Sequence, residues 1–499
     1  MAKEQLMEYE KALELFEVVI GLEVHIELNT KSKMFCGCAN AFGDAPNTNV
    51  CPICLALPGA LPAVNKKAIE SSIAIGLALD CQIAPTGRFS RKNYFYPDLA
   101  KNFQTSQYDE PIAFEGKVSI ELEDGEVFEI DIERAHMEED AGKLTHVGGA
   151  TGRIQGAEYS LVDYNRAGVP LVEIVTKPVY GTGARAPEVA STYVRYIRDM
   201  VKAMNVSDAR MERGNVRCDA NVSIRPKGQQ KLGTRTETKN VNSLRSIENA
   251  VKYEIQRQAF ILSNGGSIIQ ETRHWHEDRG HTSSGRPKSD ADDYRYFPEP
   301  DLVPVQPSLE WIEEIRKTLP ENPALRRKRL QQDWGFADLE FRDVLNSDLL
   351  DQIEATVAAG ASAQSARKWW TGELARLANA NNSAVQDLAI TPEQVAKIQA
   401  LIDSGKLTDR MARDVVAGVL AGEGEPEAVV EKRGLKVVSD EGALIAAIDE
   451  ALAKQPEVLE KIREGKVQAA GAVIGAVMQT MRGQVDAARV RELILERAK

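Results

Sequence analysis

The sequence predicts an α+β fold in which a domain built on a mixed sheet precedes an all-α helical domain and a small all-α tail domain. Up to about residue 300, short runs with β-like alternation are separated by turn residues. After the proline-punctuated segment 296–305, strand signals become rare, and Ala, Leu, Glu, Lys and Arg dominate. A Gly-Glu-Gly-Glu-Pro run at 422–426 marks a second boundary. The expected domains are residues 1–306, 307–425 and 426–499.

Length and composition are those of a soluble protein with several domains. The chain has 499 residues, of which 43% are hydrophobic and 27% charged. It has no apolar run near 20 residues, so we expect no membrane span. The first 17 residues carry five glutamates, which suits neither a signal peptide nor a basic transit peptide, so a cytoplasmic location is expected. The net charge of −12 argues against non-specific adhesion to nucleic acid, and any RNA must meet local basic patches.

The first predicted strand, at residues 21–28, has one polar face. Glu23, His25 and Glu27 alternate with apolar residues, and side chains in a strand alternate between its two faces. Three ionisable groups on one face are costly to bury unless a cation, most simply a metal, or water satisfies them. The competing interpretation is an edge strand with a solvated face.

Two short-spaced cysteine pairs follow this strand. They are Cys36 with Cys38 and, after twelve residues, Cys51 with Cys54. This spacing can bring four thiolates around one zinc ion, in a closed shell that builds structure rather than catalyses. Disulfides are the alternative, but six cysteines in 499 residues and no secretory segment favour a reducing compartment. Two further cysteines, Cys81 and Cys218, are expected to be ordinary semi-buried thiols.

A β-hairpin is predicted at residues 118–132, around an Asp-Gly turn at 124–125. Its second strand is expected to end near Ile132, which puts the acidic run 136–143 in the loop that follows. Adjacent acids beside a histidine and a glycine can ligate a hard cation such as Mg²⁺, although acidic runs are often only solvated loops. The basic, aromatic segment 88–98 adds cations that can bind phosphates. The domain therefore combines acids for a metal with cations for phosphates, which is what phosphoryl transfer requires.

Further along the chain, a helix is predicted from Ala186 to Met204, with Pro187 early in its first turn. The chain has no P-loop motif, and the glycines between 148 and 156 are interpreted as a hairpin connection rather than a phosphate cradle. Polar alternation recurs at 161–175, 217–223 and 234–240, and each of these segments alone is equally well a half-exposed strand.

Taken together, these segments resemble the B-subunit family of the aspartyl/glutamyl-tRNA(Asn/Gln) amidotransferases. The similarity covers nearly the whole chain. The matching segments are 21–28, the four cysteines, 91–98, 136–143, 163–173, 217–223, 239–243, 293–302, 465–466 and 471–478. The chain departs from the family pattern at 148–156 and at 284–290. The resemblance implies a cradle-like kinase domain, then a helical domain and a small helical tail.

The resemblance also implies an ATP-dependent ligase. The family transfers the γ-phosphoryl group of ATP to the side-chain carboxylate of a tRNA-bound Glu or Asp, and ammonia then displaces phosphate. ATP and Mg²⁺ are the implied cofactors, beside structural Zn²⁺. The implied partners are an amidase-like A subunit that hydrolyses glutamine, a small C subunit, and tRNA(Gln) or tRNA(Asn) carrying Glu or Asp.

Site roles follow from the matched motifs. Metal binding and proton handling are expected of Glu23, His25, Glu138 and Glu139. Catalytic roles are expected of Lys92, on phosphate or transition-state charge, and of His25, Glu139 and Tyr94. Cofactor binding is expected of Arg166, Asp219 and Glu237. Two other classes compete: a non-catalytic tRNA-binding scaffold, and a zinc hydrolase that uses His25 and Glu27.

The tail is the expected contact with tRNA. From Glu460 to Lys499 there are eight basic and five acidic residues, a net charge of +3 against −12 for the whole chain. The family uses this tail on tRNA, which favours a phosphate-binding surface over a merely solvated helical one. The run Arg326 to Arg329 is the next candidate.

Overall fold

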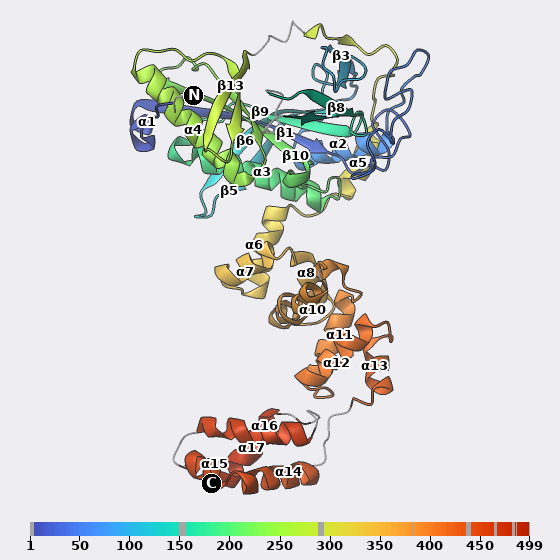
Figure 1. Cartoon of the computed structure of the whole chain (residues 1–499), viewed down its shortest axis with the longest axis vertical. Coiled ribbons are helices and arrows are strands. Elements are labelled where there is room, and N and C mark those ends of the chain that lie inside the picture. Colours follow the sequence, from blue (N-terminus) through green and yellow to red (C-terminus); the bar gives the residue numbers. More distant parts are fainter. Residues whose placement is uncertain are drawn as a thin grey trace. The chain divides into compact units, whose positions relative to one another are not determined.

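The computed structural model describes residues 4–148, 156–287, 294–381, 383–435, 441–463, 467–481, 485 and 487–498. The chain forms two compact units, Met1–Leu325 and Arg326–Lys499 (Figure 1). A mixed sheet with covering helices makes up the first unit, and the second is helical, so the predicted α+β class is confirmed. The tip of the 148–156 loop, the end of the 284–290 segment and the tail cations Lys466, Arg482 and Lys499 lie outside the described residues.

Among the residues that the structure describes, twelve strands form the main sheet of the first unit. Ten of them run in the order β13-β12-β11-β10-β1-β9-β6-β4-β3-β14; β5 pairs with β6, and β2 with β5. The pair β11–β12 is parallel, and the other pairs are antiparallel. The strands are β1 (Phe16–Glu27), β2 (Gln82–Ile83), β3 (Ser90–Asn93), β4 (Phe103–Ser106), β5 (Ala113–Glu121), β6 (Val127–Glu139), β9 (Pro170–Thr176), β10 (Val216–Pro226), β11 (Thr236–Val241), β12 (Glu271–His276), β13 (His281–Pro287) and β14 (Phe297–Pro298).

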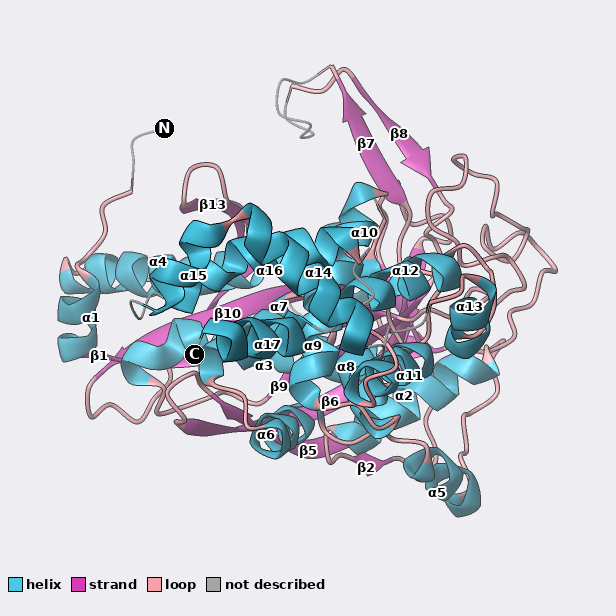
Figure 2. Ribbon diagram, turned by 90° about the horizontal axis from the view of Figure 1, so that it is seen from below, coloured by secondary structure: helices cyan, strands magenta, loops and turns pink. Residues whose placement is uncertain are grey.

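A separate two-stranded hairpin and seven helical segments complete the described part of this unit. The hairpin, β7 (Lys143–Val147) with β8 (Tyr159–Asp163), extends away from the main sheet (Figure 2). The helical segments are α1 (Tyr9–Leu15), α2 (Lys66–Ala78), η1 (Gly183–Arg185), α3 (Ala186–Ala203), η2 (Met211–Arg213), α4 (Leu244–Ser263) and α5 (Leu309–Lys317).

Strand β1 has one apolar face, which helices cover, and one polar face. Leu22, Val24 and Ile26 are almost fully buried, whereas the alternate residues Glu23 and His25 are only half-buried. Helices α3 and α4 pack against β1 and β10, and they cover the apolar face. The predicted alternation is confirmed, and the polar side chains lie on the face opposite the helices.

The hairpin predicted near residues 118–132 is present as β5 and β6, and Gly125 has φ +89° in its turn. The predicted end of the second strand near Ile132 is wrong. After a register shift between Ile132 and Arg134, β6 continues to Glu139 as a partner of β9. Polar residues are tolerated in this buried strand because neighbouring strands supply their hydrogen-bond partners. The predicted helix at 186–204 is confirmed as α3, with Pro187 in its first turn.

The second unit consists of helices in its described part. They are α6 (Pro323–Trp334), which begins at the end of the first unit, α7 (Asp338–Asn346), α8 (Leu350–Ala358), α9 (Ala363–Arg367), the π-helix η4 (Lys368–Leu374), α10 (Ala375–Ala380), η5 (Val385–Asp387), α11 (Pro392–Asp403), α12 (Asp409–Leu420), α13 (Pro426–Lys432), α14 (Glu441–Lys454), α15 (Pro456–Arg463), η6 (Val467–Ala469), α16 (Ala470–Thr480) and α17 (Ala487–Ala498).

Two apolar cores lie in these helices. One spans Leu330 to Val429, and the other spans Leu444 to Ile494. Helix α5 packs on α2 of the first unit, and Val429 of α13 belongs to the Leu330–Val429 core. The boundaries expected at 306/307 and 425/426 stay predictions. Within the described residues, every helix is too short or too polar to cross a membrane.

Candidate functional site

Four charged or imidazole side chains form one row across the centre of the sheet. Arg217 of β10 is in register with His25 of β1, His25 with Glu173 of β9, and Glu173 with His136 of β6. In-register residues on neighbouring strands share a face. The row therefore lies on the polar face, opposite the helices, although its members come from four separate parts of the chain.

Three side chains that could hold a metal meet at this row. One ligand atom each from His25, Glu138 and Glu173 lies within 4.8 Å of the other two. His25 Nε2 is 3.9 Å from Glu173 Oε2. We call these three residues the His25 cluster. Ser106 Oγ donates to Glu138 Oε1 at 2.8 Å, and Gln104 Nε2 donates to Glu138 Oε2 at 3.2 Å.

The charges around the His25 cluster favour ionised carboxylates. Burial alone would raise the pKa of Glu173, but the hydrogen bond from His136 and the charges of His25 and Lys92 hold it well below its usual range. The pKa of Glu138 is lowered in the same way: His136 and Lys92 outweigh burial and the repulsion from Glu173. Both carboxylates are thus available to a cation at neutral pH.

A second carboxylate group lies two residues along the same face of β1. Ligand atoms of Glu23, Asp219 and Glu237 also lie within 4.8 Å of one another. We call these the Glu23 cluster. Lys239 Nζ is 2.7 Å from Asp219 Oδ2 and 3.5 Å from Glu237 Oε1. Burial alone would lower the pKa of Lys239, but the surrounding acids raise it, so the lysine is a fixed cation beside three acids.

Lys92 lies on the other side of the His25 cluster, among tyrosines. Its Nζ is 4.9 Å from the ring centre of Tyr294, and the rings of Tyr94 and Tyr294 meet edge to face at 6.0 Å. Burial, reinforced by Asp98, raises the pKa of Tyr94. The Tyr94 hydroxyl is therefore a proton donor rather than a base at neutral pH.

Arg166 is placed beside the turn that follows β6. It donates from Nε to the Ala141 carbonyl and from Nη2 to the Gly142 carbonyl, both at 3.0 Å. Its Nε is 3.4 Å from Asp140 Oδ2, and Arg217 Nη2 is 2.8 Å from the same oxygen. These contacts give Arg166 a part in holding this turn.

Glu139 is a predicted metal ligand that the structure keeps apart from both clusters. This buried carboxylate forms an ion pair with the half-buried Lys101, and its Oε1 accepts the backbone N–H of Thr105 at 2.8 Å. Because Glu138 and Glu139 are consecutive in a strand, they point to opposite faces. The expectation that they ligate one metal together has no geometric support, and any catalytic role of Glu139 stays a prediction.

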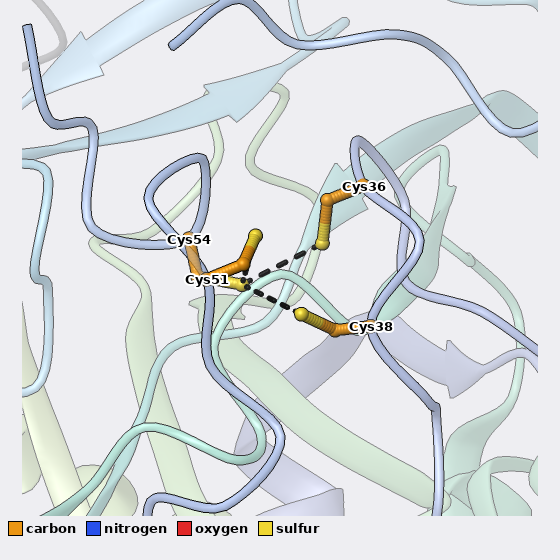
Figure 3. A group of neighbouring side chains, drawn as sticks. All are labelled: Cys36, Cys38, Cys51 and Cys54. Atoms are coloured by element: carbon orange, nitrogen blue, oxygen red, sulfur yellow. Dashed lines mark hydrogen bonds between the residues drawn. The ribbon is translucent and has the colours of Figure 1, made fainter.

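The four cysteines converge into one cluster (Figure 3). Cys54 Sγ lies 3.5 Å from that of Cys36, 3.7 Å from that of Cys51 and 3.8 Å from that of Cys38. A zinc–sulfur distance of about 2.3 Å puts the sulfurs of a regular tetrahedron about 3.8 Å apart. The spacing therefore fits a metal such as zinc with four sulfur ligands.

A buried lysine supplies positive charge to this cluster. Lys33 is fully buried, with its Nζ 3.6 Å from Cys54 Sγ, 2.7 Å from the Asn49 carbonyl oxygen and 3.2 Å from that of Tyr164. A hydrogen bond from Cys36, helped by Lys33, lowers the pKa of Cys54. A buried ammonium group is costly without nearby negative charge, so Lys33 suits a cluster of thiolates.

Sequence reasoning missed Glu173, His136 and Lys239 as members of the site. Glu173 stands between apolar residues in a buried strand, and this isolated carboxylate was the one local signal for it. His136 begins the 136–143 motif, in which the three acids are the more evident metal ligands. Lys239 follows Glu237 at a spacing of two on β11, so both side chains lie on one face.

The fold and these clusters define an α+β protein whose sheet presents carboxylates, imidazoles and lysines suited to cations and phosphates, beside a candidate four-cysteine metal site. A family profile described as GatB/GatE catalytic domain matches residues 18–313, and one described as GatB domain matches residues 351–497.

The relatives agree with these profiles. The B subunit of the aspartyl/glutamyl-tRNA(Asn/Gln) amidotransferase of Leifsonia xyli subsp. xyli is 73% identical over 498 residues, 100% of both chains. The proteins of the same description from Clavibacter sepedonicus (67%, 100% of both chains) and Streptomyces coelicolor (64%, 99% of this chain and 98% of the relative) are also similar. The chain belongs to the B-subunit family of the aspartyl/glutamyl-tRNA(Asn/Gln) amidotransferases, which confirms the resemblance and, at the level of the family, the expectation of an enzyme.

Proposed function

We propose that this chain carries out the ATP-dependent amidation of glutamyl-tRNA(Gln), aspartyl-tRNA(Asn) or both. A side-chain carboxylate oxygen of the tRNA-bound amino acid attacks the γ-phosphorus of ATP, and the bond to the β-γ bridging oxygen breaks to release ADP. Ammonia then attacks the carbonyl carbon of the acyl phosphate. Phosphate leaves with the bonding electrons, and the nitrogen loses a proton to give the amide.

The observation that carries this proposal is the polar face with its two clusters between Lys92 and Lys239. Phosphoryl transfer depends mainly on positioning and on neutralising the charge of the phosphates. Lys92 lies beside the His25 cluster, and Lys239 lies within the Glu23 cluster. In this proposal, either ammonium group would bind a phosphate oxygen that also faces a cation held by the acids.

The donor sets fit magnesium. The Glu23 cluster offers only carboxylate oxygens, and the His25 cluster offers two carboxylates and one imidazole. Magnesium at these residues would offset negative charge on ATP and on the transferring group. The sequence predicts Glu23, His25, Glu138 and Glu139 as metal ligands. In the proposed sites, Glu173 takes the place of Glu139 beside His25 and Glu138, and Glu23 belongs to the other cluster, with Asp219 and Glu237.

We assign structural zinc to Cys36, Cys38, Cys51 and Cys54. The four thiolates would fill the coordination shell of zinc and leave no position for substrate. The role of this site is therefore to hold the loop that contains it, next to the sheet.

Ammonia would come from a partner. In the described part of the chain, no hydrogen bond or ion pair joins Cys81 or Cys218 to a histidine, as a glutaminase nucleophile of this type would need. The proposed partners are an amidase-like glutaminase and a small third protein of the complex. The tail would hold the tRNA through its basic residues.

The test is amidation by the reconstituted complex with mischarged tRNA, ATP and ammonia supplied directly. Single-turnover phosphate release measures the first step. We expect Glu173→Gln to slow it on the order of 10²-fold or more, because a cation ligand is lost. Glu129→Gln, on the exposed end of the adjacent strand β6, is the control. Phosphate release by Glu173→Gln at the wild-type rate would refute this site, and no tRNA-dependent release by the wild type would refute the function.

A further inference from the structure

His136 is fully buried between two carboxylates of the His25 cluster. Its Nε2 lies 3.3 Å from Glu138 Oε1 and 3.2 Å from Glu173 Oε2. An imidazole nitrogen that faces two carboxylate oxygens must carry its hydrogen, since a lone pair would be repelled by both. His136 thus donates to both oxygens and fixes their separation.

Glu173 depends on this contact more than Glu138 does. Glu138 also accepts hydrogen bonds from Ser106 and Gln104 on β4. The Glu173 carboxylate lies 3.2 Å from His136 but 3.9 Å from His25. Without His136, the position of Glu138 would still be held, whereas Glu173 would lose its closest hydrogen-bond donor.

The ring of His136 is itself held in place. Tyr108 meets it edge to face at 6.2 Å, and Tyr108 stacks on Tyr296 at 5.4 Å with an angle of 20° between the rings. His136 Nδ1 is buried and has no hydrogen-bond partner among the described residues. The ring orientation is thus set by aromatic packing and by the Nε2 contacts, and these direct Nε2 at the cluster.

We propose that His136 is a positioning residue, which acts by holding Glu138 and Glu173 at the separation that a divalent cation requires. The effect of His136 on amidation rests on the proposed function. Its effect on cation affinity does not, because that affinity can be measured without tRNA or ATP. Hydrogen bonds to ligating carboxylates commonly change metal affinity 10- to 100-fold when they are removed.

The test compares two amides at position 136 in the full-length chain. The Nε2 amide of His136→Gln reaches the place of the imidazole Nε2, whereas the amide of His136→Asn is one bond shorter and falls near Nδ1. Mn²⁺ affinity, measured from the EPR signal of the free ion, should fall about 10- to 100-fold in His136→Asn. It should stay within about threefold of the wild type in His136→Gln. Met137→Leu, the next buried residue on the opposite face, controls for damage to the strand.

A second readout separates positioning from a general role in stability. If His136 positions the ligands, excess Mg²⁺ should restore amidation by His136→Asn, whereas a variant that had only lost stability would not recover. Equal Mn²⁺ affinity in the wild type and His136→Asn would overturn the proposal, as would equal weakening in both amide variants or no Mn²⁺ binding to the wild type. Normal Mn²⁺ results together with absent amidation would instead count against the proposed function alone.

Discussion

The carboxylates of Glu138 and Glu139 lie on opposite faces of strand β6 and belong to separate polar networks. Glu138 contacts His136 and Ser106 on the polar face, whereas Glu139 pairs with Lys101 and caps the Thr105 amide. The two neighbouring carboxylates of this motif therefore have different roles. One acid is available to a cation, and the other neutralises the half-buried Lys101.

The first prediction separates these two acids. Glu138→Ala should weaken Mn²⁺ binding at least tenfold with a small change in stability. Glu139→Ala should keep Mn²⁺ affinity but lower the free energy of unfolding by about 3 kcal/mol, because it leaves the half-buried charge of Lys101 without its carboxylate partner. Mn²⁺ titration and urea unfolding of both variants check this. Weakened Mn²⁺ binding by a stable Glu139→Ala would return Glu139 to the metal site.

The second prediction concerns zinc. Cys51→Ser should lower the zinc content from one per chain towards zero and reduce the melting temperature, because a structural site contributes folding free energy directly. Metal analysis by mass spectrometry and thermal unfolding are the measurements. Cys81→Ser, a buried thiol outside the cluster, should keep its zinc. Absence of zinc from wild-type protein purified without chelator would argue against this assignment.

The third prediction is a pH dependence set by Glu254. This buried carboxylate accepts hydrogen bonds from Thr236 at 2.8 Å and Thr282 at 2.6 Å. Burial alone would raise its pKa, but Arg257 and Arg273 lower it below the ordinary value of 4.5. Since the folded-state pKa is depressed, the stabilisation is complete above about pH 4.5 and is lost as the pH falls towards the depressed value.

Glu254→Gln should therefore cost about 3–5 kcal/mol of unfolding free energy at pH 7 and less at pH 3.5. Urea unfolding at both pH values measures the difference, with the exposed Glu129→Gln as the control. A cost that does not change between pH 7 and pH 3.5 would contradict this account of the network.

The fourth prediction tests the tail. Truncation after Leu435 is preferable to removal of residues 426–499, because Val429 is fully buried in the core of the preceding helices. The truncated chain should bind tRNA more weakly and with a flatter salt dependence, since fewer counterions are released. Affinity at several KCl concentrations measures both. An unchanged affinity and salt slope would place the phosphate contacts elsewhere in the chain.

The run at 326–329 is a weaker alternative for RNA than its sequence indicates. Arg326 Nε is 2.8 Å and Arg329 Nη2 is 3.0 Å from the Glu354 carboxylate. These two guanidinium groups are thus already partly neutralised within the helical unit. A run of basic residues in the sequence shows how many cations are present, but it does not show which acids pair with them in the folded protein.

Local patterns predicted the parts of the site that depend on nearby residues. The alternation around His25 and the spacing from Cys36 to Cys54 led to the polar strand face and to the cysteine cluster. The division of Glu23 from His25 could not be predicted, because it depends on the strands that flank β1. Glu23 meets Asp219 of β10, and His25 meets Glu173 of β9.

The missed end of β6 has a similar cause. His136 to Glu139 is too polar for a buried strand when judged alone, and partners such as Ser106, Lys101 and the paired strand β9 make it favourable. Such partners come from strands that are distant in the sequence, and a single sequence does not reveal how those strands pair. The same limit hid Glu173, whose importance depends on the two histidines on either side of it.

The sequence separation between residues that meet in the fold has a consequence for the order in which parts of the protein form. Cys36 and Cys54 are 18 residues apart, whereas the hydrogen bond from Asn215 to Glu27 in the same sheet spans 188 residues. Short loops close early in folding, and long-range pairing closes late. The four cysteines can therefore meet before the sheet is complete, whereas the Glu23 cluster cannot form until β10 has paired with β1 and β11 with β10.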